Sequence, residues 1–345
     1  MSYSPIKTAI VGYGFSAKTF HLPFITTLPE LSLCAISSSQ QQLVTTEQPQ
    51  AKYFASAEAM LEQSDAELVI ITAPNNVHFK LAKLALENGK HVIVEKPFVL
   101  DVADGETLVK LAKDKGLKLS VFHNRRWDGD FLTIQKLIAD HKIGEIKHFE
   151  AHFDRFRPTV RDRWREQSTE GGGILFDLGP HLLDQALQLF GKPTAITAQC
   201  RSMRPNSKNV DYFNIMLHYP DFYAQLHANL YSCEPNIRFN ILGSEGKYQK
   251  FGLDPQEDYL KAGIMPDKAE WADETPEMYG TVYKEGQAAE VIQTERGGYQ
   301  HYFKTMADAI RLNKNEPVTA EQALENIKLI ELAIKSSEQG KTLTV

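Results

Sequence analysis

Two side chains able to exchange a proton with a substrate lie four residues apart, at Asp177 and His181. If the helix that we predict to continue to Phe190 includes Asp177, the two side chains share one face near its N-terminal end. A histidine exchanges a proton near neutral pH, and a nearby carboxylate can orient the imidazole or raise its basicity. Pro180 suits the first position of this helix. The structural alternative is a capping Asp177 and a His181 packed in the core.

A lysine follows a predicted strand in the sequence Glu95-Lys96-Pro97. The strand covers residues 91–94, so Lys96 comes at a carboxyl strand end, where ligands bind in open α/β sheets. An ammonium there would stabilise negative charge that develops on a substrate oxygen. Pro97 interrupts the strand ladder and can hold a strained or cis turn. The alternative is a surface lysine in a loop.

A glycine-rich turn lies between a predicted strand over residues 6–11 and a predicted helix over residues 15–28. Its pattern is G-x-G-x-x-G/A, in which Gly12 permits the tight turn, Gly14 lets a pyrophosphate approach the backbone, and Ala17 keeps helix and strand close. The start of the helix offers free N–H groups to phosphates. We therefore predict a dinucleotide site, against the alternative of a purely structural turn, formed by Gly12, Gly14, Phe15, Ser16 and Ala17.

Three serines, Ser37-Ser38-Ser39, end the second predicted strand, and the first acidic residue after them is Glu47. A carboxylate at this strand end would hold the ribose 2′-OH of NAD and repel the 2′-phosphate of NADP, whereas a serine hydroxyl can donate to that phosphate. We predict that Ser37 and Ser38 contact the cofactor and that NADP is preferred, with NAD as the alternative. Lys18 is the nearest cation that the sequence suggests. The alternative, a plain serine-rich turn, is not excluded by the sequence.

Further polar residues follow the ends of the predicted strands. Pro74 fixes the turn after the strand over residues 68–73, and Asn75 either binds the cofactor or caps the next helix. His78 faces the same edge and is otherwise a residue of the first helical turn. The cofactor-binding residues predicted at these strand ends are Pro74, Asn75, His78, Glu95, Lys96 and Asn124.

Arginine and tryptophan gather in two places that could contact a substrate. One is Asn124-Arg125-Arg126-Trp127, after the last strand of the first series, and the other is a cluster of arginines over residues 155–165. Arginine can hold polyol hydroxyls, a carboxylate or a phosphate, and tryptophan can cover an apolar sugar face. The alternative is a solvated surface paired with Asp154, Asp162 and Glu166. The predicted substrate residues are Arg125, Arg163 and Trp164.

Apolar runs alternate with amphipathic stretches over the first third of the chain. We predict strands at 6–11, 31–36, 68–73, 91–94 and 117–121, with helices between them that include 77–87 and 101–115. This alternation is typical of βαβ units in a doubly wound parallel sheet.

The pattern changes after about residue 123. A helix is predicted over 130–141, followed by strands at 146–156, 194–203, 212–219, 223–231 and 237–242, with a turn at 243–246. Such runs indicate a largely antiparallel sheet. Thr319-Ala-Glu-Gln322 is a capping box that opens a last helix to about residue 338. We therefore predict an α/β chain with a dinucleotide-binding domain over 1–123 and a substrate-binding and oligomerisation domain over 124–345.

Composition narrows the class of protein. The 345 residues carry 38 Lys and Arg against 44 Asp and Glu, a net charge of −6 without a basic tract, so a nucleic-acid partner is not expected. The apolar runs are far shorter than the roughly 20 residues that a membrane helix needs. The three cysteines form no C-x-x-C pair, and His and Cys show no metal-binding spacing, so no metal is predicted. A strand beginning at Ile6 leaves no room for a signal peptide, and we expect a cytoplasmic protein.

In the order and spacing of these motifs, the chain resembles the Gfo/Idh/MocA oxidoreductase family over its whole length. The resemblance implies an N-terminal Rossmann domain and a C-terminal α/β domain whose open sheet often mediates oligomer contacts, hence a homo-oligomer, dimer or tetramer. It also implies that Lys96, Asp177 and His181 match the family's catalytic lysine, aspartate and histidine. The motifs Phe20-His21-x-Pro23 and His123-Asn-Arg-Arg-Trp-Asp128 resemble the bacterial scyllo-inositol dehydrogenase (NADP+) subgroup.

From the motifs and the family resemblance, we predict an NAD(P)-dependent oxidoreductase. It would transfer hydride between a nicotinamide cofactor and a secondary alcohol of a cyclitol or sugar, such as scyllo-inositol. The substrate would bind between the domains. His181 would take the hydroxyl proton, Asp177 would orient His181 or a neighbouring hydroxyl, and Lys96 would hold the reacting oxygen or share the proton transfer. Two alternatives are an NAD-dependent glycosidase of the same fold and a non-catalytic dinucleotide sensor that binds a protein partner.

Overall fold

The computed structural model describes residues 4–162, 164–167 and 170–345 and divides the chain into two compact units. The first unit comprises Met1–Asn124, Gln256–Trp271 and Gly298–Glu325. The second comprises Arg125–Pro255, Ala272–Gly297 and Asn326–Val345. The first unit therefore takes in two later segments of the chain in addition to its N-terminal part.

The first unit is built on a parallel sheet with the strand order β3-β2-β1-β4-β5-β6. β1 pairs with β2 on one side and with β4 on the other, so the strand order reverses beside β1, which is where open α/β sheets bind ligands. The prediction of a doubly wound parallel sheet is confirmed. The strands are β1 (Ile6–Val11), β2 (Leu31–Ser37), β3 (Lys52–Phe54), β4 (Leu68–Ile71), β5 (His91–Val94) and β6 (Leu119–Val121).

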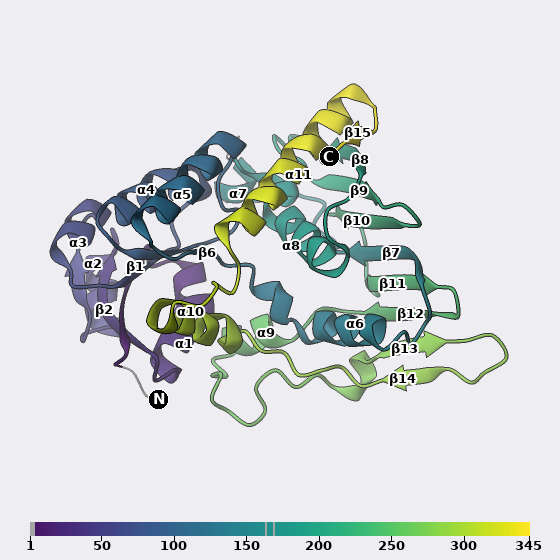
Figure 1. Ribbon diagram of the computed structural model, residues 1–345, viewed down its shortest axis with the longest axis horizontal. Helices are drawn as coiled ribbons and strands as arrows, with labels where there is room; N and C mark the ends of the chain where they lie inside the picture. Colours follow the sequence, from purple (N-terminus) through teal and green to yellow (C-terminus); the bar gives the residue numbers. More distant parts are fainter. Residues whose placement is uncertain (1–3, 163, 168–169) are drawn as a thin grey trace. The chain divides into compact units, whose positions relative to one another are not determined.

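Helices cover both faces of this sheet (Figure 1). The Phe24 ring of α1 stacks on the Phe303 ring of α10, with 4.9 Å between their centroids. The side chain of Asp101 caps α5 by accepting from the backbone N–H of Asp104. The helices are η1 (Ala17–His21), α1 (Leu22–Thr27), α2 (Gln41–Glu47), α3 (Ala57–Gln63), η2 (Asn75–Val77), α4 (His78–Glu87), α5 (Val102–Lys115), α9 (Gln256–Lys261) and α10 (Gln300–Leu312).

The second unit contains a larger sheet with the strand order β14-β13-β12-β11-β7-β10-β9-β8-β15. β7 and β10 pair in parallel, and the other described pairs are antiparallel, which confirms the predicted character of this sheet. The strands are β7 (Ile146–His152), β8 (Ala195–Arg201), β9 (Tyr212–His218), β10 (Tyr223–Asn229), β11 (Ile237–Gly243), β12 (Gly246–Phe251), β13 (Gly280–Tyr283), β14 (Glu290–Ile292) and β15 (Leu343–Thr344).

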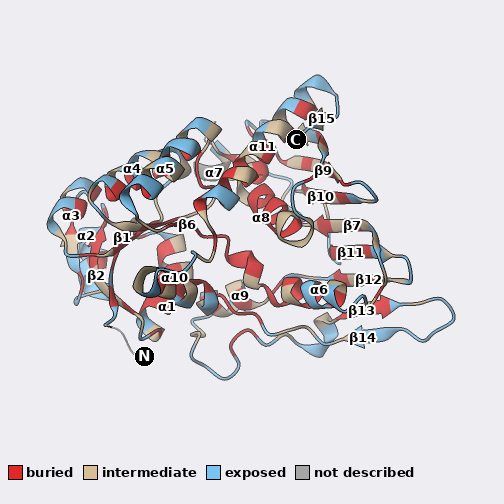
Figure 2. Cartoon of the chain, viewed as in Figure 1, coloured by how far each residue is buried: buried red, intermediate tan, exposed pale blue. Residues whose placement is uncertain are grey.

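One face of the larger sheet packs against the helix α8 (Gly173–Phe190). Phe149 of β7 is fully buried, and its ring lies 5.2 Å from the ring of Phe190 at the end of α8. Successive side chains of a strand alternate between the two faces, so Glu150 and His152 point away from α8. Both are half-buried, whereas α8 is largely buried (Figure 2). The other helices of this unit are η3 (Asn124–Trp127), α6 (Gly129–Ala139), α7 (Trp164–Gln167) and η4 (Pro276–Met278).

The start of α8 corrects one prediction. Pro180 lies inside the helix and not at its first position, because α8 begins at Gly173, where φ is +79°. A proline inside a helix removes one backbone hydrogen bond. Burial of the apolar side chains Ile174, Leu175 and Leu178 stabilises the turns before it, and this outweighs the loss. Asp177 and His181 are thus both helical, and they share a face as expected for positions i and i+4.

The last long helix, α11 (Ala320–Gln339), begins in the first unit and continues in the second. Its predicted capping box is confirmed, because the Gln322 backbone N–H donates to Thr319 Oγ1, and the Thr319 N–H donates to Gln322 Oε1, both at 3.3 Å. None of the helices in the described part of the chain is long and apolar enough to cross a membrane.

Candidate functional site

The glycine-rich turn has the geometry that its sequence predicted. Gly12 has a φ of +98°, and a Cβ there would lie 2.7 Å from Thr72 Oγ1. A Cβ at Gly14 would meet nothing within 4 Å, so the backbone faces open space at the position expected for a pyrophosphate. Ala17 is fully buried beside the sheet, and Phe15 is exposed. The helix that follows contains a π-helical segment, Ala17–His21, a feature that is frequent at functional sites.

Glu95 connects this helix to the end of β5. Ser16 Oγ donates to Glu95 Oε1, and His21 Nε2 lies 2.8 Å from the same oxygen. Burial alone would raise the pKa of Glu95, but the hydrogen bond and charge of His21, the hydrogen bond from Ser16 and the charge of Lys96 together outweigh burial and lower the pKa to about 2. Lys96 follows directly, and its backbone N–H donates to Glu95 Oε2. The Lys96–Pro97 peptide bond is cis. The structure thus holds Lys96 at the same sheet edge as the glycine-rich turn.

His78 is fully buried in the first unit. Its Nδ1 lies 2.8 Å from the carbonyl oxygen of Pro97, and its Nε2 lies 2.9 Å from that of Ala73. Desolvation by burial lowers the pKa of His78. We infer that His78 positions the ends of β4 and β5 relative to each other, and its predicted contact with the cofactor stays a prediction. Pro74 precedes η2, in which Asn75 is the first residue.

The serine-rich strand end is tied to its neighbours by hydrogen bonds. Ser38 Oγ accepts from the Gln40 N–H at 3.0 Å, and the Ser38 carbonyl accepts from Tyr53 Oη at 2.9 Å. The carbonyl of Ser37 accepts from the Gly12 N–H at 2.9 Å. Ser37 and Ser38 therefore lie beside the glycine-rich turn, and their predicted contact with the cofactor stays a prediction.

A carboxylate to which the sequence assigned no role lies beside this turn. Glu47, at the end of α2, accepts from Tyr13 Oη at 2.8 Å and forms an ion pair with Lys18 Nζ at 2.7 Å. The Lys18 ammonium also lies 4.8 Å from the centroid of the Tyr13 ring. The cation predicted to favour NADP is thus paired with a carboxylate. No local signal could reveal this, because Tyr13 and Glu47 are 34 residues apart in sequence.

In the second unit, α8 carries Asp177 and His181. His181 is buried, and its ring lies 6.4 Å from that of Phe153. The guanidinium of Arg125 lies 5.0 Å from the centroid of the same Phe153 ring. The structure therefore brings Arg125, one of the predicted substrate residues, to the aromatic ring that His181 contacts. Phe153 was not predicted, because its role depends on the packing of β7 against α8.

The segment that carries Arg125 is fixed to α8 by buried polar contacts. Arg126 makes two hydrogen bonds to the carboxylate of Asp184, at 2.8 and 2.7 Å, and Gln185 Nε2 donates to the Arg125 carbonyl at 2.9 Å. Arg125 itself lies 3.3 Å from Asp128. Asn124, the predicted cofactor residue at the start of η3, is buried.

The arginine cluster after β7 is partly engaged in pairs with acids. Arg161 Nε donates to Glu166 Oε1 at 2.6 Å, and Arg204 donates to Glu166 Oε2 at 3.0 Å. For Arg161, these contacts agree with the alternative interpretation, in which the arginines pair with acidic side chains on the protein surface. Arg163 lies outside the described residues, and Trp164 begins the short helix α7. Their predicted contacts with a substrate stay predictions.

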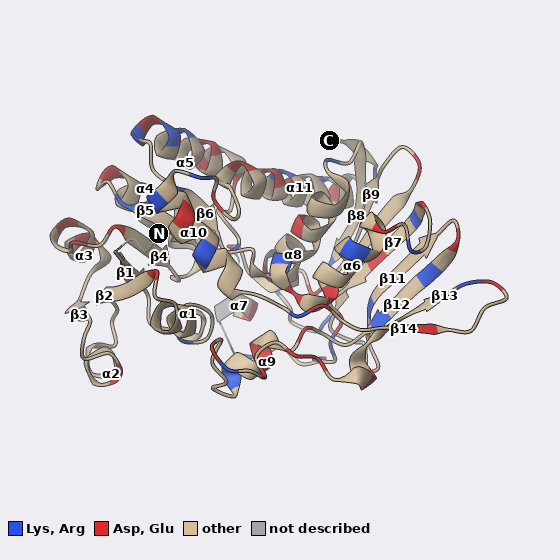
Figure 3. Ribbon diagram, turned by 60° about the horizontal axis from the view of Figure 1, so that its bottom comes forward, with Lys and Arg blue, Asp and Glu red and all other residues tan. Residues whose placement is uncertain are grey.

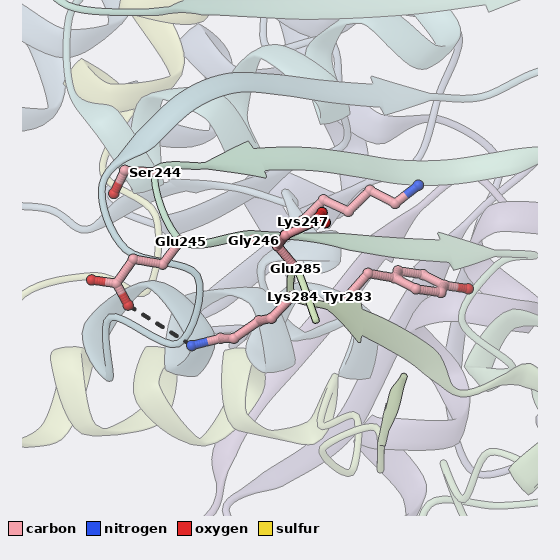
Figure 4. A pocket seen from close by; sticks show the side chains of 7 residues that line it. All are labelled: Ser244, Glu245, Gly246, Lys247, Tyr283, Lys284 and Glu285. Atoms are coloured by element: carbon pink, nitrogen blue, oxygen red, sulfur yellow. Dashed lines mark ion pairs between the residues drawn. The ribbon is translucent and has the colours of Figure 1, made fainter. Parts of the chain in front are cut away.

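A hollow of about 470 Å³ lies at the turn between β11 and β12 (Figure 4). Its polar lining includes Lys284 and Glu245, whose charged groups are 3.8 Å apart. None of the described residues predicted for cofactor, substrate or catalysis lines it, so we do not assign the chemistry to this hollow.

Comparison with known proteins identifies the family. The model of an oxidoreductase family with an NAD-binding Rossmann fold matches residues 6–123, and the model of the family's C-terminal alpha/beta domain matches residues 135–345. The chain belongs to the Gfo/Idh/MocA oxidoreductase family. The resemblance noted from the motifs is thereby confirmed, together with its Rossmann domain and its second α/β domain.

Several known oxidoreductases are similar to the chain over nearly its full length. It is 42% identical over 339 residues to the uncharacterized oxidoreductase YdgJ of Escherichia coli (strain K12), with 98% of each chain covered. It is 38% identical over 341 residues to the scyllo-inositol 2-dehydrogenase (NADP(+)) IolW of Bacillus subtilis (strain 168), which covers 98% of this chain and 95% of that relative. The solved structure of yvaA from Bacillus subtilis has a TM-score of 0.95 at 37% identity, with 100% of both chains covered.

Proposed function

We propose that this Gfo/Idh/MocA oxidoreductase is an NADP-dependent dehydrogenase that oxidises a secondary alcohol of a cyclitol or sugar, with scyllo-inositol as the first candidate. The observation that carries the proposal is the pair Asp177 and His181 on one face of α8, beside Phe153 and Arg125. A histidine with a carboxylate at this spacing is suited to accept a hydroxyl proton. The naming of the relative IolW as a scyllo-inositol dehydrogenase supports the substrate class.

The residues of the first unit fit a dinucleotide. The open space beside Gly14 and the left-handed Gly12 leave room for a pyrophosphate against the backbone, at the start of a helix that offers N–H groups. We assign the phosphates to Gly12, Gly14, Phe15, Ser16 and Ala17. We assign the adenosine ribose to Ser37 and Ser38, and the remaining contacts to Pro74, Asn75, Glu95, Lys96 and Asn124.

The bound nicotinamide supplies the hydride chemistry, and the protein supplies position and charge. In the oxidation, His181 accepts the proton of the substrate hydroxyl. Asp177 orients His181 or a neighbouring substrate hydroxyl, and the Lys96 ammonium holds the reacting oxygen and stabilises its negative charge. In the reduction of the matching ketone, His181 returns the proton.

We also propose a preference for NADP and assembly as a homo-oligomer. Ser37 and Ser38 present hydroxyls where an NAD-specific site has a carboxylate, and IolW is named as an NADP(+) enzyme. The pairing of Lys18 with Glu47 opposes this preference, because the lysine must leave the carboxylate to meet a 2′-phosphate. The oligomeric state is measured by light scattering after size-exclusion chromatography.

The proposed reaction is tested by screening inositols and aldoses with the purified protein and either NADP+ or NAD+. We expect reduced nicotinamide to accumulate with at least one cyclitol or sugar, and more efficiently with NADP+. Substrate turnover without net nicotinamide reduction would assign the chain to the glycosidase reaction instead. Dinucleotide binding without turnover of any sugar or cyclitol would favour a sensor.

A further inference from the structure

A cluster of two histidines and two carboxylates lies on the face of the larger sheet opposite α8. Glu150, His152 and Asp154 follow one another at every second position along β7 and its extension, so that they share a face. His227 of β10 is the direct parallel partner of His152 in the strand register. The pairing of β7 with β10 therefore brings together residues that are 75 positions apart in sequence.

The distances within the cluster are close to those of a metal site. His152 Nδ1 lies 3.2 Å from Asp154 Oδ2, and His227 Nδ1 lies 2.9 Å from Asp154 Oδ1. In a tetrahedral zinc site with bonds of 2.0–2.1 Å to nitrogen and oxygen, neighbouring ligand atoms are about 3.3 Å apart. Among the described residues, this is the one set of three potential ligands whose ligand atoms all lie within 4.8 Å of one another.

Hydrogen bonding leaves one potential ligand atom of the cluster without a partner. His152 Nδ1 is hydrogen-bonded to Asp154 Oδ2 at 3.2 Å, whereas His227 Nδ1, in the part of the chain that is described, is buried without a hydrogen-bond partner. Asp154 Oδ1 lies 2.9 Å from His227 Nδ1. We infer that the angle at this contact is unsuitable for a hydrogen bond. A buried polar atom left without a partner costs free energy, and a shared cation would satisfy both the imidazole and the carboxylate.

The surrounding contacts hold the carboxylates in place. Asp154 Oδ1 accepts from the backbone N–H and from Nδ2 of Asn229, at 3.1 and 2.9 Å. Glu150 accepts from Asn240 Nδ2 at 3.0 Å, and its Oε2 lies 3.7 Å from His152 Nε2. Glu150 is thus placed to orient the imidazole of His152, in the way that a carboxylate behind a metal-bound histidine does. Figure 3 shows charges of both signs along the strands of this sheet.

We propose that His152, Asp154 and His227 bind a divalent transition-metal ion, with Glu150 as the outer carboxylate that orients His152. Two imidazoles and a carboxylate favour zinc over the oxygen-preferring ions magnesium and calcium. Two neutral imidazoles, two carboxylates and a dication also sum to zero charge, which suits a half-buried site. The side chains of His152 and Asp154 point away from the face on which Phe153 contacts His181, so the ion is structural: it links β7 to β10 and takes no part in hydride transfer.

The test uses the untagged full-length protein after treatment with a chelator and titrates it with zinc by calorimetry, with magnesium as the comparison. We expect one zinc ion per chain, no magnesium binding at the same concentrations, and a rise in melting temperature with zinc. Variants His227→Gln and Asp154→Asn keep the side-chain shape, and each should weaken zinc binding by at least about 100-fold, since even losing an outer partner costs 10–100-fold.

His218→Ala is the matched control. His218 lies on β9, on the same face of the sheet, and contacts Thr197 at 2.8 Å outside the cluster. We expect this variant to bind zinc as the wild type does. The proposal is overturned if the wild type binds no zinc, or if zinc binding persists unchanged in His227→Gln and Asp154→Asn. Both outcomes are independent of the proposed dehydrogenase reaction, because binding and melting temperature are read without turnover.

Discussion

His21 Nε2 lies 2.8 Å from Glu95 Oε1 and joins the helix after the glycine-rich turn to the strand end that carries Lys96. Ser16 Oγ donates to the same carboxylate oxygen, so Glu95 holds two positions of that helix. The two contacts join residues that are 79 and 74 positions apart in sequence. The position of Lys96 relative to the dinucleotide turn therefore depends on a buried, ionised Glu95.

We expect Glu95→Gln to destabilise the protein in a pH-dependent way. The folded-state pKa of Glu95 is lowered to about 2, below the unfolded value near 4.5, so the charge contributes stability above about pH 4.5 that is lost as the pH falls towards 2. At neutral pH the loss should be roughly 3 kcal/mol. Urea unfolding at pH 7, pH 4 and pH 3 measures it, with the exposed Glu106→Gln as the control. A difference between wild type and variant that stayed constant down to pH 3 would contradict the assignment.

The glycines of the turn should separate folding from cofactor binding. Gly12→Ala places a Cβ against Thr72 at a φ of +98°, and we expect a loss of roughly 1–3 kcal/mol in unfolding free energy. Gly14→Ala meets no protein atom within 4 Å, so this variant should fold as the wild type does. It should nevertheless bind the dinucleotide at least roughly tenfold more weakly, because the methyl group takes the space of the pyrophosphate. Fluorescence titration with NADPH alongside urea unfolding tests both variants, and normal NADPH affinity in Gly14→Ala would refute the placement.

Cofactor preference should respond to the carboxylate beside Lys18. Glu47→Gln removes the ion pair with Lys18 and a negative charge near the proposed 2′-phosphate, so the ratio of kcat/KM for NADP over NAD should rise by roughly fivefold. Ser37→Asp should shift the ratio towards NAD through repulsion of the 2′-phosphate. Steady-state kinetics with both cofactors measures the ratio. An unchanged ratio in Glu47→Gln would show that Lys18 does not reach the phosphate, and a wild type that prefers NAD by tenfold or more would exclude our interpretation of the serines.

The proposed catalytic residues should affect turnover and leave cofactor binding intact. We expect His181→Ala to lower turnover by roughly 10²–10⁴-fold through loss of proton transfer. Lys96→Ala should have at least a comparable effect, because its charge acts on the developing oxyanion. Asp177→Asn keeps the shape and removes the charge, so its pH–rate profile should differ from that of the wild type. Kinetics across pH with parallel NADPH titration checks all three. If His181→Ala bound the cofactor much more weakly but kept near-normal turnover at saturating cofactor, His181 would be structural.

Features that depend on neighbouring residues could be predicted from the sequence. The left-handed Gly12 and the capping box of Thr319 and Gln322 each arise from the conformational limits and hydrogen bonds of a few adjacent residues. Buried β-branched runs likewise indicated the parallel sheet, and alternating runs indicated the antiparallel one. The short elements α2, β3 and α3 were not predicted, because segments of three to seven residues carry too few buried positions to show a period.

Features that depend on contacts between distant segments could be found only in the tertiary structure. Pro180 is helical because burial along α8 outweighs its local preference for a first turn. Glu47 meets Lys18 only once α2 has packed beside the glycine-rich turn, and His152 meets His227 only through the register of β7 with β10. A shift of one residue in that register would turn one histidine to the opposite face of the sheet, so no spacing along the chain could have revealed the cluster.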